Sequence, residues 1–168
     1  MEQVALAISV AAVILSCLLG IRTLTLARQA NAMPMLVDLF TEHRGARLSE
    51  ARRFVYRYLS SADVTNGLDS LPDEARELVR ELGCFYDNMG ALVAHGIVDV
   101  DAVSGYLGGA IVPVWEAMMP LVEAERARRT VHYDPSRWQA YFENLYLLVK
   151  NQPPDQARKR QKRWHLRD

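Results

Sequence analysis

The sequence predicts an all-α protein with a single N-terminal transmembrane helix followed by a small cytoplasmic bundle of about five helices. Residues 4–21 (VALAISVAAVILSCLLGI) contain no charged side chain. Apolar residues recur at helical spacing along most of the remaining chain, and no stretch alternates as a half-buried strand would. We therefore divide the chain into an external N-terminus (1–3), an anchor (4–26), a cytoplasmic helical domain (27–152) and a basic tail (153–168).

The apolar run has the length of a membrane span. As a helix, residues 4–21 extend about 27 Å, close to the roughly 30 Å hydrocarbon core of a bilayer. One alternative is a cleaved signal peptide, because Ala30-Asn31-Ala32 offers an A-x-A site, and another is a buried soluble helix. Signal peptides carry positive charge before the apolar region and are cut soon after it. Here Glu2 precedes the run and Arg22 follows it, so the flanks favour an uncleaved anchor.

Basic residues near the anchor predict its orientation. None precedes the run, whereas Arg22 and Arg28 lie just after it and Arg44 and Arg47 follow farther on. Lysine and arginine accumulate on the cytoplasmic side of membrane helices. We therefore expect a single-pass protein of the inner (plasma) membrane, with the N-terminus outside and the domain in the cytoplasm. The lipid bilayer is then its first partner.

One face of the anchor carries small residues. Ala12, Ser16 and Gly20 recur at every fourth position, a pattern that lets two membrane helices approach closely. This face is a candidate packing surface for a homo-oligomer or for a partner helix. The alternative is that small residues are simply frequent in an alanine-rich helix.

The first part of the domain is predicted to contain two helical segments. The anchor helix is expected to continue to Pro34 and to kink or restart there, because proline lacks an amide donor and restricts the preceding residue. A short apolar stripe then ends near Gly45. The next helix is predicted from Ser49, a candidate N-cap, to Leu59, and a surface loop follows.

The central and last helices have the clearest signals. Pro72 lies in the first turn of the central helix, and Gly96 is placed to end it. The last helix should be capped by Asp134, begin at Pro135 and end before the double proline at 153–154.

Glycine and proline are predicted to interrupt the stretch between these two helices. A short helix is expected from Asp99 or Asp101 to about Leu107, and the glycine pair 108–109 should break it. A second segment, which carries Trp115, should then be bent by an internal proline at 120.

No pattern in the sequence indicates a catalytic centre or a bound metal. The four histidines occur singly, and none of them builds a convincing metal site on a helix together with another His, Cys or carboxylate. The glycines at 105, 108 and 109 lack the lysine of a phosphate-binding loop. We therefore expect a non-enzymatic protein with no catalytic, cofactor-binding or metal-binding residues and no cofactor.

Aromatic residues adjoin two carboxylates on strongly apolar helices. Tyr86 precedes Asp87, and Trp115 precedes Glu116. A partly buried carboxylate can take part in acid–base chemistry when it shares a cleft with a ligand, although it more often pairs with an arginine or a tyrosine hydroxyl. We interpret these four residues as a candidate ligand or partner pocket, with a purely structural role as the alternative.

Two further features receive structural interpretations. Cys84 is predicted to be a small core residue rather than a nucleophile, because nothing near it in sequence supplies a base. Cys17 and Cys84 are badly placed to pair, so no disulfide is expected. The segment EAERARR (123–129) mixes both signs of charge and is interpreted as a solvated helix face with short-range ion pairs.

The C-terminal tail is strongly basic, with six Lys and Arg residues against two aspartates in residues 155–168, whereas the whole chain has a formal net charge of zero. Each basic residue near an anionic leaflet contributes about 1 kcal/mol to lipid binding. Nucleic-acid binding fits the same charge but is disfavoured, because no recognised nucleic-acid-binding fold accompanies it. An inert solvated tail is the third interpretation. The candidate lipid or nucleic-acid contacts are Arg158, Lys159, Arg160, Lys162, Arg163 and Trp164.

The order of several motifs resembles a known family. After the apolar run come MLVDLFTEHR (35–44), ARRFVYRYL (51–59), FYDNMGALVAHGIVD (85–99), VWEAMMPLVEAER (114–126) and YFENL (141–145). This series resembles the bacterial domain-of-unknown-function family 4760 over most of residues 1–150. The resemblance implies a small, helical, membrane-anchored protein, and it supplies no catalytic residue. The basic tail lies outside it.

These observations predict an adaptor or accessory subunit that holds a partner protein at the membrane, because the domain has a strong apolar core and no recognisable chemistry. The alternative is a membrane-tethered ligand sensor or effector in a stress or phage response, with a pocket between its helices.

Overall fold

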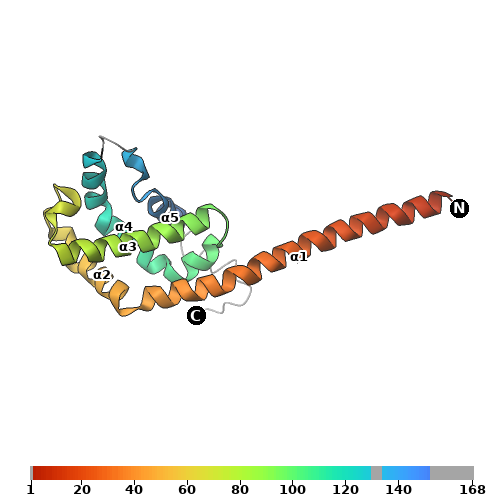
Figure 1. The fold of residues 1–168 in the computed structure, drawn as a ribbon, viewed down its shortest axis with the longest axis horizontal. Coiled ribbons are helices and arrows are strands. Elements are labelled where there is room, and N and C mark those ends of the chain that lie inside the picture. Colours follow the sequence, from red (N-terminus) through yellow and green to blue (C-terminus); the bar gives the residue numbers. More distant parts are fainter. Residues whose placement is uncertain (1, 130–133, 152–168) are drawn as a thin grey trace, which may run out of the picture. The chain divides into compact units, whose positions relative to one another are not determined.

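The computed structural model describes residues 2–129 and 134–151, and every regular element in those residues is a helix. The all-α fold class is therefore confirmed. The chain divides into two compact units, Met1–Phe40 and Thr41–Asp168, and we call the described part of the second unit the helical domain. Figure 1 shows the α-helices in chain order: α1 (Glu2–Arg44), α2 (Ala46–Arg57), α3 (Asp73–Ala94), α4 (Val100–Arg128) and α5 (Ala140–Asn151).

The first unit consists of α1, which continues without interruption through Pro34. The predicted restart at this residue is therefore wrong. Proline has a φ angle that suits a helix, and its penalty comes from one missing amide donor and a contact with the preceding turn. Strong helix formers on both sides of Pro34 outweigh that penalty here. Only the last turn of α1, from Thr41 to Arg44, belongs to the helical domain.

The next two helices largely follow the sequence signals. α2 begins at Ala46 after Gly45, so Ser49 is an interior residue and not the predicted N-cap. α3 starts directly after Pro72, which is the N-cap and not part of the predicted first turn, and it ends at Ala94. Gly96 adopts a φ of 66°, and its amide donates to the carbonyl of Val93. A left-handed glycine of this kind ends many helices.

α4 is one continuous helix, so the break predicted at Gly108 and Gly109 is wrong. Gly108 is buried and faces α5, because a β-carbon there would be in ordinary van der Waals contact, at 3.4 Å, with the side chain of Val149. Two helices predicted to be separate therefore merge, and the domain contains the last turn of α1 and α2–α5 in its described residues.

α5 starts later than predicted. Asp134 accepts a hydrogen bond from the amide of Ser136, but the helix that it caps is only a 3-10 turn, Pro135–Arg137. Gln139 then takes a φ of 59°, which redirects the chain before Ala140 begins α5. A non-glycine residue with positive φ is uncommon and requires support from its surroundings.

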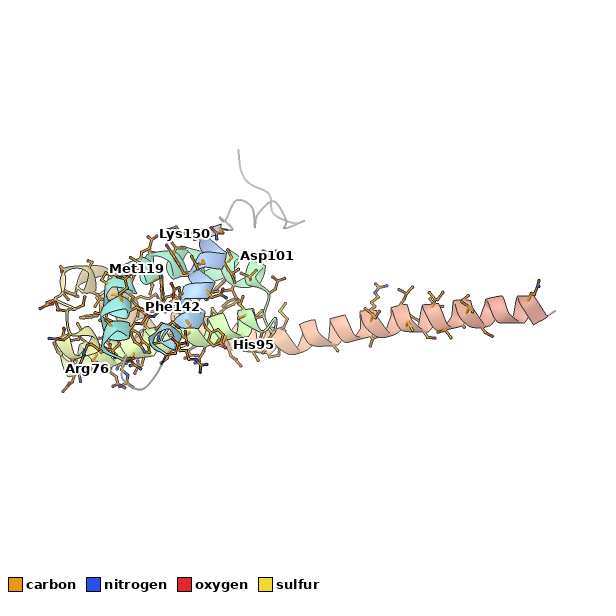
Figure 2. The ribbon with its side chains drawn as sticks, turned by 90° about the horizontal axis from the view of Figure 1, so that it is seen from above. Arg76, His95, Asp101, Met119, Phe142 and Lys150 are labelled. Carbon is orange, nitrogen blue, oxygen red and sulfur yellow. The ribbon has the colours of Figure 1, made fainter. Side chains whose placement is uncertain are left out.

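Two glycines of α3 allow the first turn of α5 to approach closely. A β-carbon at Gly83 would lie 2.9 Å from the side-chain nitrogen of Gln139, and one at Gly90 would lie 2.1 Å from the main-chain oxygen of Tyr141. Phe142 follows in the same turn and points into the interior of the domain (Figure 2). The other large side chains that are fully buried include Tyr86, Leu82, Met89, Leu107, Ile111, Met118, Leu121 and Leu145.

Candidate functional site

The two aromatic residues of the predicted pocket lie together in the core. Tyr86 on α3 is fully buried, and Trp115 on α4 is 3% exposed. The ring of Phe142 packs against both, stacked on Tyr86 at 4.7 Å between centroids and edge-on to Trp115 at 4.9 Å. Such aromatic pairs contribute about 0.5–1.5 kcal/mol beyond the area they bury. These three rings join α3, α4 and α5.

The two carboxylates of the predicted pocket hold other elements of the domain. Asp87 accepts a hydrogen bond of 3.0 Å from the amide of Phe142, and this amide is one of the free donors in the first turn of α5. Glu116 is exposed and forms an ion pair with Lys150 at 3.1 Å, while Tyr146 also donates to it. The four predicted residues are thus all engaged within the domain, and a ligand pocket among them stays a prediction.

A buried polar cluster that the sequence did not reveal lies where α1 ends. His43 is 8% exposed, and a hydrogen bond of 3.0 Å joins its Nε2 to the hydroxyl of Tyr86. Arg52 of α2 donates to the main-chain oxygen of His43 at 2.7 Å and to the hydroxyl of Ser49 at 3.0 Å. We call His43, Arg52 and Tyr86 the junction cluster. It connects the last turn of α1 with α2 and α3.

The junction cluster keeps its imidazole neutral. Burial, and then the positive charges of Arg52 and Arg44, lower the pKa of His43 from 6.5 to about 4. Burial also raises the pKa of Tyr86 well above its usual value, so this hydroxyl stays protonated. A neutral imidazole and a neutral hydroxyl can share one hydrogen bond without a buried charge. No sequence pattern points to this contact, because its two partners are 43 residues apart.

The segment 123–129 organises the loops of the domain. The predicted short-range ion pairs are present, because Glu125 pairs with Arg129 at 2.9 Å, but the prediction of a solvated face is wrong at Glu125. Glu125 is only 8% exposed and accepts a hydrogen bond of 3.0 Å from the amide of Leu68. Arg126 pairs with Glu143 at 2.8 Å and also donates to the carbonyl of Trp138. The loop before α3 and the segment before α5 are therefore both held by hydrogen bonds to the last turns of α4.

Several other predicted residues can be placed. Cys84 is a free and exposed thiol, so its prediction as a core residue is wrong: it lies on the outer side of α3. Ala12, Ser16 and Gly20 are exposed on α1, and a β-carbon at Gly20 would meet nothing within 4 Å. The candidate tail contacts, residues 158–164, lie outside the described residues.

In residues 2–129 and 134–151, no group of three or more His, Cys, Asp or Glu side chains is arranged to hold a metal ion.

Two apolar segments bear on the membrane prediction. By length and composition α4 is the one helix of the described chain that could cross a bilayer, and 44% of its most apolar window is buried inside the structure. Its buried side chains form part of the core of the domain. The stretch Ser9–Thr23 of α1 is a shorter apolar helix by the same measure. The span predicted for residues 4–26 stays a prediction.

The comparison with protein families identifies the chain. The model for a domain of unknown function, DUF4760, matches residues 5–151. The chain belongs to the DUF4760 family. The resemblance noted in the sequence is thereby confirmed. The DUF4760 match includes α1 and ends at Asn151, where α5 also ends, so the basic tail lies outside it. No curated protein and no solved structure matches the chain.

Proposed function

We propose that the chain is a single-pass membrane protein whose helical domain acts as an adaptor or accessory subunit for a partner protein at the inner membrane. The single observation that supports a membrane tether is the exposure of large apolar side chains along α1. Side chains from Val10 to Ile21 are 51–65% exposed, and such a continuous apolar surface needs a lipid or protein covering. The residues are Val10, Val13, Ile14, Leu15, Leu18, Leu19 and Ile21.

The exposed residues surround the helix rather than forming one stripe. Positions 13, 14, 15 and 18 point in different directions around a helix with 3.6 residues per turn. A helix that is apolar on all sides suits hydrocarbon on all sides. The arginine bias after this segment supports an outside N-terminus and a cytoplasmic domain.

The interior of the domain supports the adaptor role over ligand sensing. Phe142 packs directly against Tyr86 and Trp115, and Asp87 is occupied by a main-chain amide. A ligand pocket is a concave site with a few convergent polar groups. Here the polar groups of the predicted pocket already have partners elsewhere in the domain, so the outer surface is the better candidate for recognition.

The tether can be tested by extraction and topology. The full chain should remain with membranes in alkaline carbonate and dissolve only in detergent, whereas a variant lacking residues 4–26 should be soluble. A reporter active only in the cytoplasm should work when it is fused after Asp168. Carbonate extraction of the full chain would disprove the tether, and activity only from a periplasm-dependent reporter would overturn the topology.

The adaptor role can be tested by purifying the membrane form in mild detergents. We expect a protein partner in fixed stoichiometry. The variant Gly20→Leu, with Gly20→Ala as the matched control, separates contacts between membrane helices from binding by the domain, because leucine blocks close helix approach and alanine permits it. A lone, monodisperse protomer in every mild detergent would contradict the proposal.

A further inference from the structure

The junction cluster holds a titratable group in surroundings that do not tolerate a positive charge. The imidazole of His43 lies against the rings of Phe85 and Tyr86, at 5.7 and 5.9 Å between centroids. Only 8% of the surface of His43 is exposed to solvent. A charge placed in such a site costs free energy unless it is paired with an opposite charge.

The groups around His43 supply no opposite charge. From α2, Arg52 donates to its main-chain oxygen. From α1 itself, Arg44 adds a second positive charge, and its guanidinium lies over the ring of Tyr106 in α4 at 5.0 Å. From α3 the titratable neighbour is Tyr86, which burial keeps neutral. None of the ion pairs found in the described residues includes His43, and its sequence neighbour Glu42 is exposed.

We propose that the junction cluster is a proton-sensitive latch, in which protonation of His43 releases the last turn of α1 from α2 and α3. A protonated imidazole would face two guanidinium groups in an apolar site. It would also be an obligatory donor at Nε2, so the hydroxyl of Tyr86 would have to act as the acceptor. In the released state the imidazole reaches water and binds its proton freely.

The direction of the pH effect follows from linkage. The docked state binds the proton of His43 less tightly than the released state, because its pKa lies near 4 instead of 6.5. Docking is therefore strongest above pH 6.5 and weakens as the pH falls toward 4. Each unit of pKa difference is a factor of ten, so the docking equilibrium changes about tenfold by about pH 5.5.

The latch belongs to the helical domain, so it does not depend on the membrane tether being correct. Its use would be to change how firmly residues 41–44 are held against α2 and α3 when the surrounding solution becomes acidic. Failure of the tether and failure of the latch are therefore distinguishable results.

Amide hydrogen exchange of the full chain in detergent micelles tests the latch. Between about pH 7 and about pH 5.5, protection of residues 41–45 should fall about tenfold after correction for the intrinsic exchange rate, while protection of the buried part of α3 stays constant. The variant His43→Gln, which retains an amide for Tyr86 but cannot titrate, should lose this dependence. The matched control His95→Gln removes an exposed imidazole and should keep it.

Three results would overturn the latch: constant protection of residues 41–45 in the natural chain, the same loss in the His43→Gln variant, or an equal loss throughout α3. If that variant does not fold, the imidazole resonance of His43 in the natural chain decides. A neutral form that persists below about pH 5.5 supports the latch, and titration near the ordinary value of histidine overturns it.

Discussion

Replacing Gly90 by alanine should lower the free energy of unfolding of the helical domain by about 3 kcal/mol, at the upper end of the usual cost of overpacking. The new β-carbon would lie 2.1 Å from the carbonyl oxygen and 2.5 Å from the carbonyl carbon of Tyr141. Both atoms belong to the main chain of α5, so no side-chain rotation can relieve the contact. α5 has to move away from α3, and the stacking of Phe142 on Tyr86 moves with it.

Gly109→Ala is the matched control. Gly109 is an exposed residue inside α4, and a β-carbon there would meet nothing within 4 Å. Alanine should therefore stabilise the domain by about 0.5–1 kcal/mol through its better helix propensity. Urea unfolding of the full chain in micelles, followed by tryptophan fluorescence, measures both variants. Equal stability of the two variants would show that α3 and α5 do not approach at Gly90.

Replacing Phe142 by alanine should cost about 3–5 kcal/mol, the range for a large aromatic residue removed from a core. Phe142 is fully buried, and its ring is the shared neighbour of Tyr86 and Trp115. Truncation would leave a cavity between three helices and remove two aromatic contacts at once. The near-ultraviolet circular dichroism of Trp115 should weaken together with the stability.

Leu147→Ala is the control for the loss of an apolar side chain from α5. Leu147 is 48% exposed, and surface substitutions of this kind usually change stability by less than about 0.5 kcal/mol. A small effect of Phe142→Ala, comparable to that of Leu147→Ala, would mean that the three rings do not form the core. Binding of a small apolar molecule by the Phe142→Ala variant would instead support a core formed by the three rings.

Local signals explain which helices could be predicted from the sequence. α3 has a proline before its first turn and a glycine shortly after its last. Both residues act on the nearby backbone, so the ends of this helix can be predicted to within a few residues. The glycine pair 108–109 predicts a local break that α4 does not have, because the sequence does not show that Gly108 packs near Val149 of another helix. α5 was started too early because Asp134 and Pro135 form the signature of a helix but start only one short turn.

In the candidate site, too, local signals could be predicted from the sequence, whereas contacts between distant residues could not. The sequence placed Tyr86 and Trp115 on apolar helices, and both lie in the core. It could not show that Phe142 would fill the space between them, or that Asp87 would bind the amide of Phe142, because that residue is 55 positions away. His43 and Glu125 were overlooked as structural centres for a similar reason. Their partners Tyr86 and Leu68 come from distant parts of the chain.

The two prolines of α4 affect its hydrogen bonding. Pro113 and Pro120 lie inside this helix, and each lacks an amide hydrogen, so the carbonyls of Gly109 and Glu116 cannot receive the usual donor four residues later. Gly109, Pro113, Glu116 and Pro120 are all exposed, and water can supply the missing donors on that outer side. The inner side is buried against the other helices. The continuity of α4 is therefore conferred by its neighbours, so this helix is a product of the fold more than a local structure that precedes it.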